Sequence, residues 1–319
     1  MLYDSYGRNH DYLRVSITDR CNLRCIYCMP PEGIELKYHE EMLTYEEIIR
    51  IISLMSSLGV QNIKITGGEP LLRRGIPSFL KKIKSINGIE KITLTTNGLL
   101  LGEYINDIEA DGINISLNTL DKERYKKITG NKDTEPQNIL NYIDQLIKKQ
   151  TIVKINCVPI KTVNEEDIIP LTAFAKEKNI IVRFIELMPI GCASNLQAIS
   201  GKETAAQIEN TFGALTKINN ISGSGPAVYY SLTGFMGKIG FINAVTHNFC
   251  ETCNRLRLTS DGLLKLCLSS DLTLDLRKPL REGASDKYLT KIIQEFVQKK
   301  PKLNSFPAHH PACMSKIGG

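Results

Sequence analysis

The sequence predicts an α/β protein whose first part is an incomplete (β/α)6 TIM-type barrel followed by a C-terminal extension. Six short, β-branched segments alternate with helix-like segments over the first two thirds of the 319 residues. This alternation is typical of parallel strands joined by right-handed crossovers. Every predicted strand also ends in polar or glycine-rich residues, and only a barrel brings the ends of all its strands to one mouth. We therefore expect a partial barrel over residues 1–190 and a separate C-terminal region over residues 191–319.

The elements of the barrel are expected in a regular order along the chain. The predicted strands are residues 13–17, 62–66, 91–95, 112–117, 152–158 and 181–186. The clearest helix begins at a capping box formed by Thr44 and Glu47, continues with apolar residues at helical spacing and ends at Gly59. Asn164, followed by three acidic residues, is expected to open another helix. Residues 192–225 are rich in Ser, Asn, Gly and Ala and predict a connecting segment with one helix near residues 202–212.

Composition limits the class of protein. The net charge of +6 is spread without a basic run, which argues against a nucleic-acid-binding arm but is compatible with a small polyanionic substrate. The polar N-terminal residues and the absence of a long apolar run predict a cytoplasmic protein without a membrane segment. Six of the nine cysteines fall into two local groups, as expected for metal ligands, and Cys157, Cys192 and Cys313 are expected to be structural.

The first cysteine group directly follows the first predicted strand. Cys21, Cys25 and Cys28 have the spacing C-x3-C-x2-C, with Tyr27 before the last cysteine. Three thiolates are one ligand short of a closed metal site, so the group implies a distant fourth ligand or a metal position left open for chemistry. A zinc knuckle and three buried thiols remain the alternatives. The spacing and Tyr27 resemble the radical SAM superfamily, in which the open iron binds S-adenosylmethionine (SAM).

Two further features lie on the predicted strands. Gly67, Gly68 and Glu69 follow the second strand, where they could form only a tight turn; their position one βα unit after the cysteines resembles the superfamily motif for the amino group of SAM. Lys154 and Asn156 share one face of the fifth strand, which either is solvated or lines the barrel interior.

A second cysteine group lies in the C-terminal region. Cys250, Cys253 and Cys267 have the spacing C-x2-C-x13-C, and His247 precedes them, so a Cys3His zinc site is a serious alternative. Arg255 and Arg257 alternate on one strand face, where their guanidinium forks would suit a polyphosphate or a purine edge. On a surface strand the same two side chains would be solvated.

Both cysteine groups, the Asn254-Arg255-x-Arg257 run and the terminal Gly318-Gly319 together resemble the GTP 3′,8-cyclase family over essentially the whole chain. The resemblance implies two [4Fe-4S] clusters, the first held by Cys21, Cys25 and Cys28, and the second by Cys250, Cys253 and Cys267. Residues implied to contact SAM are Tyr27, Gly67, Gly68, Glu69, Ser116 and Met188. Residues implied to contact GTP are Arg14, Lys64, Thr95, Lys154, Arg255, Leu256 and Arg257. A catalytic role is implied for Arg14, Arg255, Arg257, Gly318 and Gly319.

The resemblance also implies the reaction and its partners. Hydrogen is taken from C3′ of GTP and the ring closes to (8S)-3′,8-cyclo-7,8-dihydroguanosine 5′-triphosphate, the first step of molybdenum cofactor biosynthesis. An electron donor such as flavodoxin or ferredoxin and a downstream cyclic pyranopterin monophosphate synthase are the expected partners of a monomer or homodimer. The chain departs from the family pattern at Asn118, at Val228 and over residues 242–246, which affects the expected pocket geometry. Composition alone predicts a frayed end at Gly318-Gly319, whereas the resemblance places this end in the pocket.

Three rival functions stay open on the sequence. A radical SAM peptide-modifying enzyme would share the first cysteine group but usually carries more C-terminal cysteines. A zinc-ribbon nucleic-acid binder would use only the second group, and the chain lacks an aromatic-laced basic patch. A ferredoxin-like electron carrier would not need 319 residues.

Overall fold

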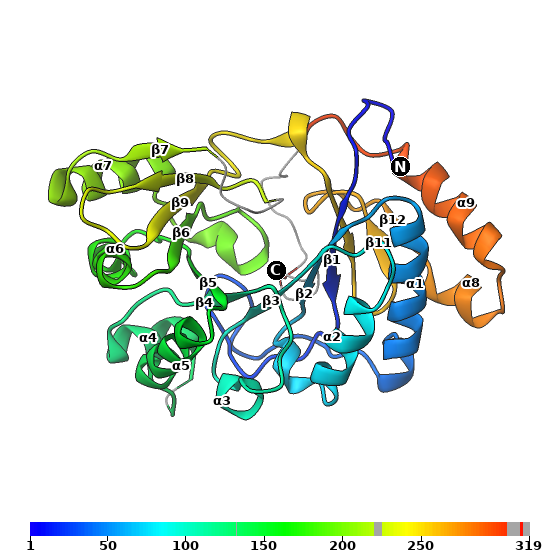
Figure 1. Ribbon diagram of the computed structural model, residues 1–319, viewed down its shortest axis with the longest axis horizontal. Helices are drawn as coiled ribbons and strands as arrows, with labels where there is room; N and C mark the ends of the chain where they lie inside the picture. Colours follow the sequence, from blue (N-terminus) through cyan, green and yellow to red (C-terminus); the bar gives the residue numbers. More distant parts are fainter. Residues whose placement is uncertain (132, 220–224, 305–312, 315–319) are drawn as a thin grey trace.

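The computed structural model describes residues 1–131, 133–219, 225–304 and 313–314 (Figure 1). Within them, twelve strands form one sheet in the order β12-β11-β10-β1-β2-β3-β4-β5-β6-β9-β8-β7. The central strands are all parallel. They are β10 (Arg255–Leu258), β1 (Tyr12–Ser16), β2 (Asn62–Thr66), β3 (Lys91–Thr96), β4 (Gly112–Ser116), β5 (Ile152–Cys157), β6 (Ile181–Ile185) and β9 (Lys238–Ile242). Short antiparallel strands complete the two edges: β11 (Leu263–Lys265) and β12 (Thr273–Asp275), and β8 (Val228–Ser231) and β7 (Thr216–Ile218).

The partial barrel predicted from the sequence is confirmed. All six predicted strands are present within two residues of their expected bounds, and no hydrogen-bonded ladder joins the two edges of the sheet in the described parts of the chain. The C-terminal region was only partly anticipated, because it adds two parallel strands, β9 beside β6 and β10 beside β1. Residues 192–225 are therefore not simply a connection. They contain a helix and the strand that begins the β7-β8-β9 meander, and they lead the chain back into the sheet.

Helices surround the curved sheet on its outer side (Figure 1). They are α1 (Tyr45–Ser57), α2 (Ile76–Lys84), α3 (Leu101–Tyr104), α4 (Lys122–Thr129), α5 (Pro136–Lys148), α6 (Ile168–Glu177), α7 (Gly201–Phe212), α8 (Arg277–Arg281) and α9 (Asp286–Val297). Single 3-10 turns are η1 (His39–Glu41), η2 (Pro70–Leu72), η3 (Glu165–Asp167), η4 (Gly191–Asn195) and η5 (Cys250–Thr252). Within the described residues, no helix is long and apolar enough to cross a membrane.

Two predicted helix starts have different outcomes. The capping box of Thr44 and Glu47 opens α1, as expected. A 3-10 turn begins directly after Asn164 and runs into α6, but the Asn164 side chain caps neither element. Instead it donates to the backbone carbonyl oxygens of Asn118 and Val158 at 2.9 and 3.1 Å, so it ties the ends of β4 and β5 together.

Strand alternation separates the core from the barrel interior. Successive side chains of a strand point to opposite faces, and apolar residues such as Leu13, Ile63 and Leu256 are buried in the main core cluster. Their neighbours along the strands, among them Arg14 and Lys64, line the interior cavity instead. The strands thus place one apolar face against the helices and one polar face around a central space.

Candidate active site: a cationic cavity and two groups of thiols

A cavity of about 260 Å³ occupies the interior of the partial barrel. The eight parallel strands of the sheet, from β10 to β9, all contribute to its wall. Of the predicted site residues, those that line it are Arg14, Tyr27, Lys64, Thr95, Ser116, Met188, Cys250, Cys253, Arg255, Arg257 and Cys267. The fold therefore brings residues implied to contact SAM and residues implied to contact GTP to one continuous cavity.

Buried cations dominate one part of this wall. Burial, followed by the charges of Arg255 and Arg183, lowers the pKa of Arg14 to about 10. Burial, followed by Arg14 and Arg255, lowers the pKa of Arg257 to about 9. Burial and the nearby Arg183 also hold the pKa of Lys64 well below its usual range. These side chains disfavour one another's charge, and a polyanion in the cavity would relieve that repulsion.

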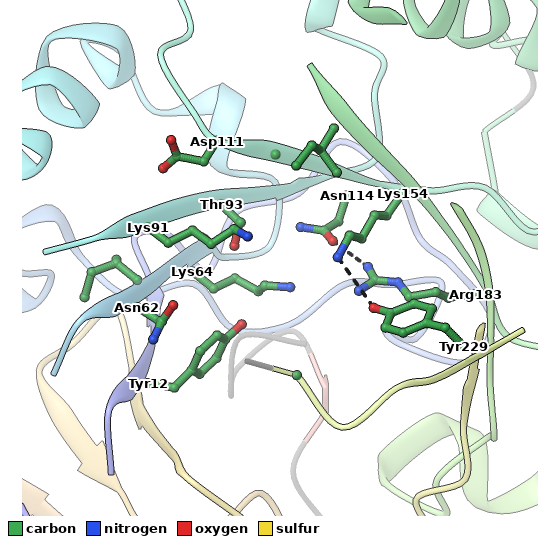
Figure 2. Close-up of a pocket in the computed structure, with 14 residues that line it drawn as sticks. Tyr12, Asn62, Lys64, Lys91, Thr93, Asp111, Asn114, Lys154, Arg183 and Tyr229 are labelled. Atoms are coloured by element: carbon green, nitrogen blue, oxygen red, sulfur yellow. Dashed lines mark hydrogen bonds between the residues drawn. The ribbon is translucent and has the colours of Figure 1, made fainter. Parts of the chain in front are cut away.

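A smaller cavity of about 50 Å³ continues the site toward the N-terminal ends of the strands (Figure 2). It shares Tyr12, Lys64 and Arg183 with the large cavity, and Lys154 points into it (Figure 2). Lys154 donates a hydrogen bond to the hydroxyl of Tyr229 at 3.5 Å. Burial, followed by Arg183 and Lys91, lowers the pKa of Lys154 to about 8. The predicted Lys154 thus lies at the narrow end of the cationic wall, outside the lining of the large cavity.

Arg183 is the main site residue that the sequence analysis missed. It lies on β6 with only 7% of its surface exposed, and it donates to the side-chain oxygens of Asn114 and Asn156. Neither Arg183 nor Lys154 has an ion-pair partner among the carboxylates of the described residues. The signal was present: a single arginine stands among the apolar residues of a strand predicted to belong to a barrel.

The first cysteine group lies in the loop after β1. Burial is the largest cause of the raised pKa of all three thiols, and it raises the pKa of Cys21 to about 11 and that of Cys25 to about 12. Neighbouring thiols of the group add to the rise at Cys25 and Cys28. Tyr27 carries this loop to the cavity wall, and its hydroxyl accepts a hydrogen bond from the Asn118 side chain at 2.9 Å. Asn118, one of the departures from the family pattern, also accepts from the backbone N–H of Val158 at 2.8 Å and so fixes Tyr27 against β5.

Gly67 and Gly68 allow the loop after β2 to pack directly against the loop that carries the cysteines. A Cβ atom on Gly68 would lie 2.3 Å from the carbonyl oxygen of Arg20, and one on Gly67 would lie 2.7 Å from that of Thr18. The N–H of Gly68 donates to Thr18 and that of Glu69 to Arg20, at 2.7 and 2.8 Å. Neither glycine lines the cavities described above. Their contacts with SAM remain a prediction, whereas their role in placing the cysteine loop follows from these contacts.

The buried Glu69 carboxylate joins the loops after β2 and β3. It accepts from the N–H groups of Leu71 and Asn97, at 3.0 and 2.7 Å, and from the hydroxyl of Thr96 at 2.7 Å. These donors favour the ionised form, but burial outweighs them and raises the pKa of Glu69 to about 7. Glu69 therefore organises the site from behind the cysteine loop and, like the glycines, does not line the cavities described above.

The second cysteine group faces the cavity beside the arginines of β10. Burial alone would raise the pKa of Cys253, but the charges of Lys300 and Arg255 lower it to about 7. The N–H of Asn304 donates to the sulfur of Cys250 at 3.3 Å. His247 is exposed, contacts Thr246 and does not line the cavity, which disfavours the Cys3His alternative.

The donor chemistry of both groups fits iron–sulfur clusters. Thiolates are the usual protein ligands of [4Fe-4S] clusters, and each binds a different iron, so the sulfurs need not converge on one point. In the described residues, no three or more His, Cys, Asp or Glu side chains are placed to hold a single metal ion. Two groups of three thiols, one in the cavity lining and the other in the loop whose Tyr27 reaches the cavity wall, are thus compatible with two cubane clusters that each keep one iron open.

The remaining predicted residues are placed as follows. The Leu256 side chain is fully buried in the core behind β10, so only its backbone can face the cavity. Gly318 and Gly319 lie outside the described residues. Cys192 and Cys313 are not isolated, because their side chains contact each other, and this contact adds to burial in raising the pKa of Cys192.

The other departures from the family pattern lie on the far side of the cavity. Val228 is half-exposed on β8. Within residues 242–246, Ile242 and Ala244 line the large cavity. The N–H groups of Val245 and Thr246 both donate to the Glu186 carboxylate at 2.8 Å, so the only carboxylate that the described part of the chain contributes to the lining is already bound by backbone donors.

Comparisons with known proteins agree with this geometry. Residues 15–175 match the family model of the Radical SAM superfamily, and residues 180–306 match that of Molybdenum Cofactor Synthesis C. Proteins named GTP 3′,8-cyclase from Heliobacterium modesticaldum and Thermodesulfovibrio yellowstonii are 42% and 43% identical to this chain. Each alignment covers 100% of this chain and 100% of the relative. The structure of Streptococcus suis SuiB bound to S-adenosylmethionine is similar in fold, with a TM-score of 0.64 and 15% identity over 98% of this chain and 78% of SuiB.

Proposed function

The chain belongs to the GTP 3′,8-cyclase family of the radical SAM superfamily, and on this premise we propose that its cavity binds SAM beside Cys21, Cys25 and Cys28 and GTP beside Cys250, Cys253 and Cys267. The protein converts GTP to (8S)-3′,8-cyclo-7,8-dihydroguanosine 5′-triphosphate, the first step of molybdenum cofactor biosynthesis. Each cysteine group holds one [4Fe-4S] cluster. The first cluster, when bound, supplies the electron that cleaves SAM and so provides a radical able to take the hydrogen from C3′ of GTP.

The observation that carries this proposal is the common cavity that has cations along one wall, the three thiols of the second group in its lining and Tyr27 of the first cysteine loop at its wall. The triphosphate is neutralised by the cations of this wall, which are Arg14, Lys64, Lys154 and Arg183. Its negative charge in turn offsets the repulsion among these side chains. Arg255 and Arg257 lie beside the second thiol group and orient the guanosine. Orientation matters because hydrogen abstraction requires the reacting atoms to be held in contact distance.

SAM is held at the other side of the cavity. Tyr27, Ser116 and Met188 all line the cavity, and the hydrogen bond from Asn118 fixes the Tyr27 ring. Glu69, Gly67 and Gly68 keep the cysteine loop in register with the strand ends. The two substrates therefore meet between the two clusters, in a space that the barrel wall shields from solvent.

Anaerobic reconstitution followed by iron and sulfide analysis tests this arrangement. Two cubane clusters require about eight irons per chain, whereas about four irons with one zinc would instead give the second thiol group a structural zinc. Cys25→Ser should abolish SAM cleavage. Cys253→Ser should retain slow SAM cleavage and lose the cyclised nucleotide, and normal product formation by this variant would contradict the assigned role of the second group.

The terminal residues and the partners belong to the same proposal. We infer that Gly318 and Gly319 help to place GTP, with the terminal carboxylate near Arg14, Arg255 or Arg257. Deletion of both glycines should then preserve the iron content and remove most cyclisation, and cyclisation at the full-length rate would contradict it. A flavodoxin or ferredoxin as reductant and a cyclic pyranopterin monophosphate synthase as the consumer of the product complete the pathway.

A further inference from the structure

The first eleven residues, to which the sequence analysis gave no function, build a buried polar network against the second cysteine group. The N-terminal segment lies beside α9 (Figure 1). The side chains of Asp4 and His10 are fully buried, and Arg8 is nearly so. Arg8 pairs with Asp4 at 2.6 Å and donates to the carbonyl oxygens of Cys250 and Pro301, both at 2.7 Å. The segment is thus joined both to the cysteine loop and to the residues that follow α9.

Lys300 is the member of this network that reaches the site. It is 3% exposed, and its ammonium group has three neighbouring acceptors. They are the carbonyl oxygen of Arg255 at 2.6 Å, the sulfur of Cys253 at 3.6 Å and Nδ1 of His10 at 3.5 Å. A lysine ammonium has three N–H donors and no acceptor. The contacts to Arg255 and Cys253 therefore hold the ammonium group between β10 and the second cysteine group.

His10 lies between Asp4 and Lys300. Its Nε2 is 3.0 Å from the Asp4 carboxylate and its Nδ1 is 3.5 Å from the ammonium nitrogen of Lys300. The ring also forms a hydrogen bond with the backbone of Asn254. These partners hold the buried ring in place beside Lys300.

We propose that Lys300 is a positioning residue that donates a hydrogen bond to the Cys253 ligand of the second cluster and raises the reduction potential of that cluster. The inference rests on the proposed function, since it requires a cluster on Cys250, Cys253 and Cys267. Hydrogen bonds to the ligand sulfurs and nearby positive charge stabilise the more negative, reduced state of an iron–sulfur cluster. The bond to the Arg255 carbonyl also ties the same ammonium to β10, so one side chain couples the cluster to the strand that carries Arg255 and Arg257.

The test isolates the second cluster in the full-length chain. Cys21, Cys25 and Cys28 are replaced together by serine, the protein is reconstituted anaerobically, and the reduction potential of the remaining cluster is measured by a redox titration followed by electron paramagnetic resonance. Lys300→Met removes the donor and the charge, and Lys300→Gln removes the charge but keeps an amide donor. Lys299→Met is the matched control, because Lys299 is adjacent in sequence, has the same charge and is exposed.

We expect a more negative potential for both Lys300 variants, with the larger shift for Lys300→Met, and the parent potential for Lys299→Met. Full iron content with an unchanged potential in both Lys300 variants would overturn the inference. Loss of the cluster from both variants would also overturn it, because Lys300 would then assemble the site and not tune it. A parent chain that holds zinc or no iron at Cys250, Cys253 and Cys267 would instead contradict the proposed function, irrespective of Lys300.

Discussion

Replacement of Arg183 by glutamine should weaken GTP binding while the fold stays intact. The guanidinium of Arg183 is held by the oxygens of Asn114 and Asn156 and lines both cavities. A glutamine amide can still donate a hydrogen bond to one of these oxygens. The substitution therefore removes the positive charge and leaves at most one of the two buried asparagine oxygens without a donor. A change in GTP binding would therefore report the charge and not a collapse of the wall.

The size of the expected loss in GTP affinity follows from the hydrogen bond that the Arg183 guanidinium would donate to the triphosphate. One hydrogen bond from a charged donor contributes about 1.5–3 kcal/mol. Since about 1.4 kcal/mol corresponds to a tenfold change in affinity, the Kd for GTP should rise roughly 10- to 150-fold. The ligand-free protein should be at least as stable, because Arg183 contributes to the lowered pKa values of Lys64 and Lys154 and its removal relieves that repulsion.

Anaerobic isothermal titration calorimetry on the reconstituted enzyme measures both sides of this prediction. GTP and guanosine are titrated separately, and only GTP binding should be weakened by Arg183→Gln. Lys202→Gln is the matched control, since Lys202 is an exposed cation on α7 whose replacement changes the net charge by the same amount. Wild-type GTP affinity in Arg183→Gln, or an equal loss in Lys202→Gln, would refute the assignment of the cationic wall to the triphosphate.

Four further predictions concern pH and the loops. The pKa of Lys154 is lowered from 10.5 to about 8, so GTP binding should weaken as pH rises through about 8, and Lys154→Met should reduce this dependence in the calorimetric Kd. Over the window from about 8 to 10.5 the unfolded chain binds the additional proton, so the free energy of unfolding of the ligand-free protein should rise with pH. Glu69→Gln places an amide donor against the donors of Leu71, Thr96 and Asn97, and thermal unfolding should show a loss of about 1–3 kcal/mol. Gly68→Ala forces a Cβ into the Arg20 carbonyl, so iron analysis should show loss of the first cluster alone, whereas Gly225→Ala, with nothing within 4 Å of the added Cβ, should retain both.

The strands could be predicted from sequence because each is a short β-branched run bounded by polar residues. The same period-two pattern put Lys154 and Asn156 on one face of β5, either solvated or lining the barrel interior, and in the structure Lys154 lines the smaller cavity and Asn156 the large one. The two added parallel strands could not be found in this way. The chain enters β9 through a short meander and β10 through the cysteine loop, so neither follows a helix directly as the six predicted strands of the barrel were expected to do.

The contacts behind the site were beyond the sequence for a different reason. Glu69 was expected at the ligand because its motif stands after a strand, yet its carboxylate is satisfied by donors from the next loop, 27 and 28 residues away in the chain. Lys300 and His10 are 290 residues apart and carry no spacing signature. A sequence motif identifies residues that contact a ligand when these residues have a fixed spacing along the chain. The residues that act on the Cys253 sulfur have no such spacing, because only three-dimensional packing brings them together.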